Sequence, residues 1–170
     1  MGEKKEHFDA VTLAFVAIAI ACAIFGSLAA GLIPAREAGF ALLSWAATGH
    51  VITLICVIIQ HETNAAVVLF VFMGFWICAG LGLSFLSSHG LHRLLMVIEP
   101  TLLAITFLWQ FLYRNKRQLR CVLLGLAWVI LWLFVSKFIP QLGVMTPYWV
   151  WALGLYLLLL AFWRRLHPAG

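Results

Sequence analysis

Long apolar runs, each broken by a short polar or turn-forming stretch, make up most of this sequence. The interruptions fall at residues 34–39, 60–64, 87–93, 114–120 and 137–147. They leave apolar segments at residues 10–33, 39–60, 65–86, 92–113, 120–137 and 147–163. A helix needs about 17–25 residues to span a bilayer, and every segment reaches that length. The pattern predicts an all-α, polytopic membrane protein with six transmembrane helices in one domain covering residues 1–170.

Composition also indicates lipid as the surroundings of this chain. Hydrophobic residues make up 65% and charged residues 10%, and the mean hydropathy is +1.06. Soluble domains have roughly 45–50% apolar and about 25% charged residues. The net charge of +5 does not indicate a nucleic-acid partner, because the cations flank apolar runs and so form a membrane-topology signal.

The cations are distributed unevenly over the two ends of the predicted helices. If the helices alternate in direction, one side of the membrane receives Lys4, Lys5, Arg114, Lys116, Arg117, Arg120, Arg164 and Arg165. The other side receives only Arg36, Arg93 and Lys137. The positive-inside rule places the richer side in the cytoplasm. We therefore expect a bacterial-type inner-membrane protein with both termini cytoplasmic.

The three predicted outer turns are built alike and are evenly spaced. Each contains Gly with Pro or Ser, and their centres near residues 36, 89 and 142 are 53 residues apart. This spacing predicts three helical hairpins around one axis, although any six-span chain with short loops shows a similar period. Small residues at spacing four, Cys22–Gly26–Ala30 and Gly74–Cys78–Gly82, predict close helix contacts within the bundle or between protomers.

Glu99, followed by Pro100, is the most unusual residue of the predicted spans. A carboxylate inside a membrane costs several kcal/mol unless it is protonated, paired or beside a wet cavity. At 100° per residue, His92, Glu99, Thr106 and Gln110 fall within about 40° of one another and form a polar stripe. Pro100 frees a carbonyl one turn earlier and favours a bend. Glu99 is either a proton-binding group or a structural acid bonded to a neighbouring helix.

His50 is the second ionisable group predicted at mid-membrane. Thr53 and Gln60 lie near it on the helical wheel, so this helix also has a polar side. With about 1.5 Å rise per residue, His50 and Glu99 differ in depth by only about 4–5 Å. Their pairing would form a proton-binding site. In the alternative, His50 donates a hydrogen bond to a backbone carbonyl.

Other candidate chemistry is weak in this sequence. His89 and His92, at i and i+3, lack a third metal ligand, and the four cysteines have no CxxC spacing. The chain contains no P-loop, nucleophile elbow, HExxH or CxxCH motif, so we expect neither an enzyme nor a metal or resident cofactor. One aromatic set predicts either core packing or the lining of a constriction: Phe70, Phe72, Phe75 and Trp76.

Parts of the chain resemble small bacterial six-span membrane proteins. The segment 125–140, the run Ala152–Leu157 and the basic pair Arg164–Arg165 resemble a hairpin of the HdeD-type acid-resistance proteins. The six-span outline with both ends inside is similar to the acetate-uptake (succinate–acetate permease) family and, more distantly, to proton-gated urea channels. The segment His7–Val11 stands where the acetate family has Asn-Pro-Ala-Pro-Leu-Gly. No functional residue is therefore carried over.

Two hypotheses of different class follow from the embedded polar residues. The first is a small-solute channel or proton-linked transporter, with weak acids as candidate solutes, that uses the polar faces bearing His50, Thr53 and Glu99. The second is a non-transporting subunit of a larger membrane assembly, or a stress-related membrane protein. In the second hypothesis His50 could ligate a haem or chlorophyll, or contact a quinone. Membrane lipids, and a homo-oligomer or larger complex, are the expected partners.

Overall fold

The computed structural model describes residues 9–86, 88–112 and 117–166. Its elements, in chain order, are α1 (Ala10–Ala29), α2 (Ala35–Trp45), the π-helix η1 (Ala46–His50), α3 (Val51–Ile59), α4 (Thr63–Phe85), α5 (Ser88–Leu112), α6 (Arg117–Ser136), α7 (Pro140–Gly143) and α8 (Thr146–Leu166). No strand occurs in these ranges, which confirms the all-α prediction. Helices α2, η1 and α3 follow one another without a break and form one rod.

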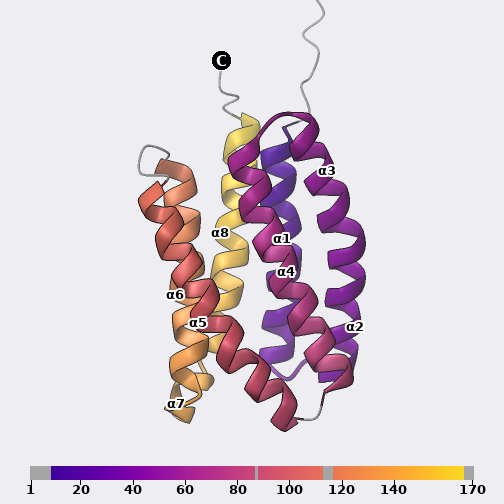
Figure 1. Cartoon of the computed structure of the whole chain (residues 1–170), viewed down its shortest axis with the longest axis vertical. Helices are drawn as coiled ribbons and strands as arrows, with labels where there is room; N and C mark the ends of the chain where they lie inside the picture. Colours follow the sequence, from indigo (N-terminus) through magenta and orange to yellow (C-terminus); the bar gives the residue numbers. More distant parts are fainter. Residues whose placement is uncertain (1–8, 87, 113–116, 167–170) are drawn as a thin grey trace, which may run out of the picture.

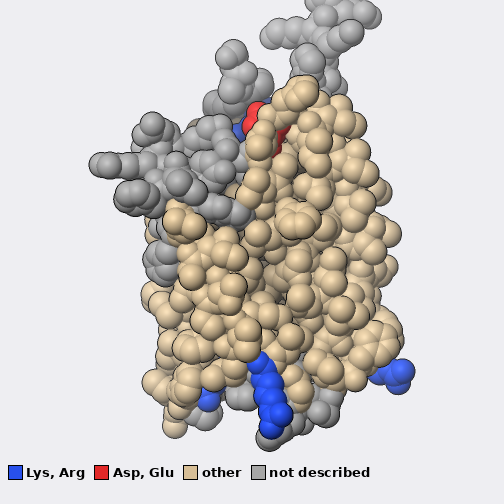
Figure 2. Space-filling view, in the orientation of Figure 1, with Lys and Arg blue, Asp and Glu red and all other residues tan. Residues whose placement is uncertain are grey.

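Four helical stretches among the described residues are long and apolar enough to cross a membrane. They are Ala10–Ala29, Ala35–Ile59, Ala65–Phe85 and Gln141–Leu166. The apolar helix Leu123–Ser136 is shorter. Figure 2 shows a face that is almost uncharged between its two ends, with the coloured Lys, Arg, Asp and Glu side chains gathered at those ends. Such a charge distribution is typical of a protein whose middle is surrounded by lipid.

The helices pack as a bundle in which α1 and α8 lie along one another (Figure 1). The other two closest pairs are α2 with α4 and α5 with α6. The predicted hairpins would instead pair each helix with its partner across an outer turn. Those partners do touch, since α1 contacts α2, α4 contacts α5, and α6 contacts α8, but less extensively. The helices of each predicted hairpin are thus in contact, but the closest pairs in the bundle are formed between different hairpins.

Small residues explain why α1 and α8 approach so closely. A Cβ atom at Gly26 would lie 2.4 Å from the Trp151 indole, and one at Gly154 would lie 3.2 Å from the Cys22 Cβ. Cys22 and Gly26 thus form the predicted small-residue contact, and it lies within the bundle. Ala30, the third member of that line, is exposed. Close backbone approach gives these helices the dense packing that stabilises bundles in lipid.

A second close approach joins α2 and α4. A Cβ atom at Gly80 would lie 2.9 Å from the Gly39 carbonyl oxygen, and one at Gly39 would lie 2.9 Å from the Gly80 carbonyl oxygen. The predicted line Gly74–Cys78–Gly82 does not include Gly80, and a Cβ atom at Gly74 would meet nothing within 4 Å. Gly80, rather than Gly74, therefore sets the distance between these two helices.

The start of α1 is tied to the ends of two other helices. Asp9 is the N-cap of α1, and its carboxylate accepts hydrogen bonds from the backbone N–H of Val11 and the hydroxyl of Thr12. Arg164, near the end of α8, donates from Nε to Asp9 Oδ2 at 2.9 Å. Gln60, just after α3, accepts a hydrogen bond from the Ala10 backbone N–H at 3.1 Å. The first and last described helices therefore share one end of the bundle.

Low pH should weaken the contact between Asp9 and Arg164. Burial raises the pKa of Asp9, but the hydrogen bonds from Arg164 and Thr12 and the Arg164 charge outweigh it and hold the pKa below 3.8. A carboxylate whose pKa is lower in the folded than in the unfolded protein stabilises the fold at pH values above the unfolded-state pKa. This stabilisation is lost as the pH falls below about 4. Asp9→Ala is expected to cost about 1 kcal/mol at pH 7, mainly through the lost helix cap.

Thermal unfolding in detergent between pH 7 and pH 3 checks this expectation. Asp9→Asn is the matched control, because it keeps a capping oxygen and removes the charge. Its stability should depend less on pH below 4 than that of the unchanged protein. Identical pH dependence in both proteins would contradict the assigned role of Asp9.

Candidate functional site

Glu99 forms an ion pair with Lys137 between helices α5 and α6. Lys137 Nζ donates to Glu99 Oε2 at 2.5 Å. The Glu99 side chain is 3% exposed and that of Lys137 is 14% exposed, so the pair is largely shielded from its surroundings. An ion pair this well covered is electrostatically strong, but both charges have lost hydration that the pairing must offset.

Local structure places the carboxylate at this point. Glu99 lies in the interior of α5, whose closest neighbour is α6, and Lys137 follows directly after the last residue of α6. Pro100 also lies inside α5. It has no N–H, so the carbonyl one turn earlier, at Met96, loses its usual helical partner. The candidate site thus combines a buried charge pair with a break in the α5 hydrogen-bond ladder.

The predicted polar stripe on α5 is partly visible. Glu99 and Thr106 are both buried. The Thr106 hydroxyl donates back to the Leu102 carbonyl at 2.6 Å, which satisfies that hydroxyl within its own helix. The side chains of His92 and Gln110 lie outside the described part of the structure. Of the two stripe residues whose side chains are described, Glu99 is the one that bonds to a residue outside α5.

His50 is fully buried in the π-helix η1, and no described residue bonds to its ring. The Trp45 carbonyl lies near the imidazole, but neither Nδ1 nor Nε2 has a partner with hydrogen-bond geometry. The Trp45 indole meets the ring edge to face, with centroids 6.4 Å apart. Thr53, also buried, donates its hydroxyl to the Gly49 carbonyl. π-Helical turns are rare and often mark functional positions, so His50 stays a candidate residue.

The structure does not pair His50 with Glu99, a contact that the sequence left open. Glu99 bonds to Lys137, whereas both nitrogens of His50 lack a partner in the described ranges. The α2–η1–α3 rod packs against α1 and α4, whereas α5 packs against α6 and α4. Similar depth in the membrane does not make two residues neighbours, because depth does not fix which helices lie side by side.

Lys137 is the site residue that sequence reasoning missed. Its place after an apolar run indicates only a loop cation that sets topology. The sequence nevertheless contained a signal for this contact. Lys137 follows the end of one predicted helix, and the predicted helix that contains Glu99 begins on the same side of the membrane. Long Lys side chains near helix ends can reach along the bundle, so a buried acid in an adjacent span is a natural partner.

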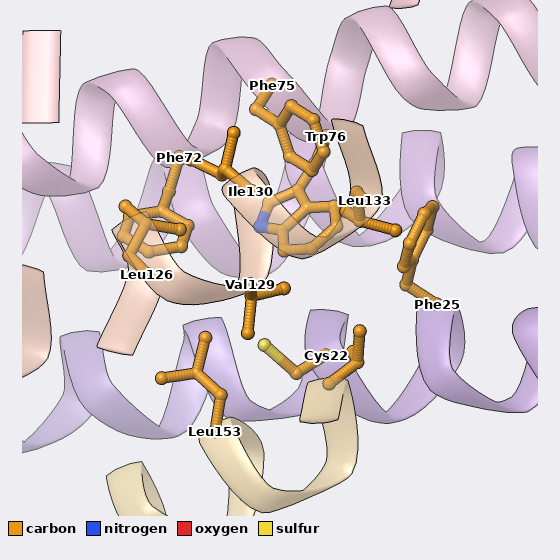
Figure 3. Close-up of a pocket in the computed structure, with 11 residues that line it drawn as sticks. Cys22, Phe25, Phe72, Phe75, Trp76, Leu126, Val129, Ile130, Leu133 and Leu153 are labelled. Carbon is orange, nitrogen blue, oxygen red and sulfur yellow. The ribbon is translucent and has the colours of Figure 1, made fainter. Parts of the chain in front are cut away.

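Two cavities in the described structure are small and wholly apolar. One, of about 20 Å³, is lined by side chains of α1, α4, α6 and α8, among them Cys22, Trp76 and Val129 (Figure 3). The other, of about 30 Å³, lies between α1 and α4. Each has room for only one or two waters. Neither is lined by His50 or Glu99.

The aromatic set on α4 packs in the core rather than around an open passage. Phe72, Phe75 and Trp76 are buried, and the Phe75 and Trp76 rings meet at 4.8 Å between centroids. Phe70, by contrast, is exposed. Figure 3 shows the Trp76 indole among the residues that line the 20 Å³ cavity. Its Nε1 is buried and has no partner among the described residues.

Cofactor ligation would need a rearranged bundle. His50 is completely covered, so a haem or chlorophyll macrocycle could reach its nitrogens only if the surrounding helices separated. Within the described ranges, no group of three or more His, Cys, Asp or Glu side chains is placed to hold a metal ion.

Comparison of this chain with protein-family models, with curated proteins and with solved structures finds no match. The resemblances noted from the sequence therefore stay predictions.

Proposed function

We propose that this chain is a six-span inner-membrane protein with both termini in the cytoplasm. Four described stretches are long and apolar enough to cross a membrane, and α5 and α6 supply the remaining proposed spans. The Asp9–Arg164 ion pair supports placing both ends of the chain on one side. The excess of cations at that end supports a cytoplasmic location by the positive-inside rule.

We further propose that the protein is a proton-linked transporter of a small solute, with weak acids as the first candidates. The observation that carries this proposal is the buried Glu99–Lys137 ion pair beside Pro100. Ionisable residues within a membrane bundle are costly and usually belong to proton or solute pathways. The proline-interrupted helix offers a place where the carboxylate can change its surroundings.

Charge balance supports a weak acid as the solute. The pair is neutral when Glu99 is ionised and Lys137 is protonated. If Glu99 takes up a proton, the Lys137 ammonium loses its partner and becomes an uncompensated, largely buried charge. A monovalent anion bound at Lys137 would restore neutrality. Joint uptake of one proton and one weak-acid anion is therefore the least costly way to load this site.

Few other charges surround the pair among the side chains that the structure describes. Helix α4 contains no Asp, Glu, Lys, Arg or His from Thr63 to Phe85. On α6, Arg117 and Arg120 stand at the opposite end from Lys137. Arg93, on α5, is exposed. The protonation state of Glu99 should thus respond mainly to Lys137 and to whatever binds there.

Flux in proteoliposomes tests the transport proposal. Acetate serves as the weak-acid probe and urea as the neutral control, each measured from pH 5 to pH 8. We expect acetate flux to rise as pH falls, by roughly tenfold per unit at most, since one proton is taken up. Glu99→Gln should flatten this profile to within about twofold while the protein stays folded, because Gln keeps the shape and some hydrogen bonding.

Glu62→Gln is the matched control, since Glu62 is an exposed acid at the start of α4. It should keep the pH profile of the unchanged protein. A Glu99→Gln variant with an unaltered profile would remove Glu99 from the proton pathway. Equal acetate flux in empty and protein-containing vesicles would remove weak-acid transport.

A second candidate function is a non-transporting subunit of a larger membrane assembly or a stress-related membrane protein. The small, apolar character of the two cavities described above favours it, because neither offers a solute a polar route. An absorption spectrum of the gently purified protein distinguishes the pigment-binding form of this hypothesis from the form without pigment. A Soret or chlorophyll band would indicate a pigment-binding subunit, whereas stable co-purification of other chains would indicate assembly without pigment.

A further inference from the structure

The connection between α6 and α8 carries a mostly apolar surface, in which Gln141 is an exposed polar side chain. We call residues 138–145, which include the short helix α7, the α7 turn. Phe138 is 63% exposed and Val144 is 71% exposed, and Ile139 and Met145 are exposed as well. The sequence contains no charged residue from position 138 to position 163. A turn between helices that faced water would normally carry polar or charged side chains.

The one cation beside the α7 turn does not face outward. Lys137 is directed to Glu99 and is mostly buried, so its charge is neutralised inside the bundle. The connection between α1 and α2, at the same end of the bundle, differs in this respect (Figure 1). There Arg36 and Glu37, in the first turn of α2, are both exposed. The two connections therefore present surfaces of different chemistry to their surroundings.

Helix lengths place the α7 turn at the edge of the hydrocarbon. About 20 helical residues, at about 1.5 Å each, cover the ~30 Å hydrocarbon core of a bilayer. From Arg120 to the end of α6 at Ser136 there are 17 residues, and from the start of α8 at Thr146 to Arg164 there are 19. Both stretches are slightly shorter than about 20 residues, so the α7 turn that joins them lies at the edge of the hydrocarbon, where acyl chains meet headgroups.

Aromatic residues beside the α7 turn fit this depth. Trp132 and Trp149 lie with ring centroids 5.6 Å apart, and Trp132 Nε1 donates to the Leu142 carbonyl, which fastens the turn to α6. Tyr148, at the start of α8, is exposed. Trp and Tyr are enriched at membrane interfaces, where an apolar ring and a polar group are both accommodated.

We propose that the α7 turn is a lipid-binding element that lies within the bilayer interface, with Phe138, Ile139, Val144 and Met145 in contact with acyl chains. The turn contacts lipid rather than a protein partner, because its exposed apolar side chains continue the uncharged surface of α6 and α8. The ion pair of Lys137 with Glu99 removes the one charge that would hold the turn in water. This inference concerns membrane placement and does not depend on transport.

Site-directed spin labelling in proteoliposomes tests the lipid contact. A nitroxide is attached to Val144→Cys in a Cys121→Ser background, which removes the exposed native thiol. Collision with oxygen reports lipid, and collision with a nickel chelate reports water. We expect high oxygen accessibility at Val144→Cys and nickel accessibility at least about fivefold lower than at Arg36→Cys, the water reference. Leu155→Cys, exposed on the middle of α8, serves as the lipid reference.

Two results would overturn the proposal. High nickel accessibility at Val144→Cys would show a turn in water, and low accessibility to both reagents would show a turn covered by protein, such as a second copy of this chain. Met145→Cys, also an exposed position, repeats the measurement at an independent site. Agreement of both positions with Leu155→Cys would support the lipid contact.

Discussion

Lys137→Met should cost about 3–5 kcal/mol of unfolding free energy, because it leaves the Glu99 carboxylate buried without its counter-ion. The carboxylate can limit this loss by taking up a proton. Glu99→Gln should cost less, because Gln keeps the shape of the side chain and an oxygen that can still accept a hydrogen bond from Lys137. The double variant Glu99→Gln/Lys137→Met should recover most of the stability lost by Lys137→Met alone.

Equilibrium unfolding in mixed detergent micelles measures these differences. Arg36→Met is the matched control, because it removes an exposed cation at the same end of the bundle and should change stability by no more than about 0.5 kcal/mol. If Lys137→Met is no more destabilising than Arg36→Met, the buried ion pair contributes little to the fold. In that case its position would reflect function alone.

Gly80→Leu should be the second strongly destabilising substitution, costing about 2–3 kcal/mol or more. The atom that a Cβ would meet at 2.9 Å is the Gly39 carbonyl oxygen, part of a helix backbone that cannot rotate aside. Helices α2 and α4 would have to separate, and the close packing that stabilises them in lipid would be lost. Thermal unfolding in detergent would show the change as a lower melting temperature.

Gly74→Leu provides a control on the same helix. A Cβ atom there meets nothing within 4 Å, so the substitution adds an apolar side chain without displacing a neighbour. We expect a change within about 0.5 kcal/mol. Equal losses at Gly74 and Gly80 would mean that glycine matters for helix geometry in α4 generally, and not for the approach of α2.

The sequence alone determined that the chain is all-α and rich in apolar helices of membrane-spanning length. Apolar runs of bilayer length need no tertiary information to be recognised, because lipid requires every backbone polar group to be satisfied within a helix. The Pro34 interruption is an example, although α2 begins directly after it at Ala35, four residues before the start of the predicted segment at residue 39. The sequence also singled out Glu99 and His50 correctly as buried polar residues, because any ionisable group inside an apolar run is costly wherever its helix packs.

Only the tertiary structure decided which of these groups meet. Helical wheels and depth allowed Glu99 and His50 to meet, yet Glu99 bonds to Lys137 while no described residue bonds to His50. The difference arises because helix neighbours are chosen by surface fit, through contacts such as Gly39 with Gly80 and Gly26 with Trp151. Such contacts depend on atoms of two helices at once, whereas periodicity describes one helix at a time.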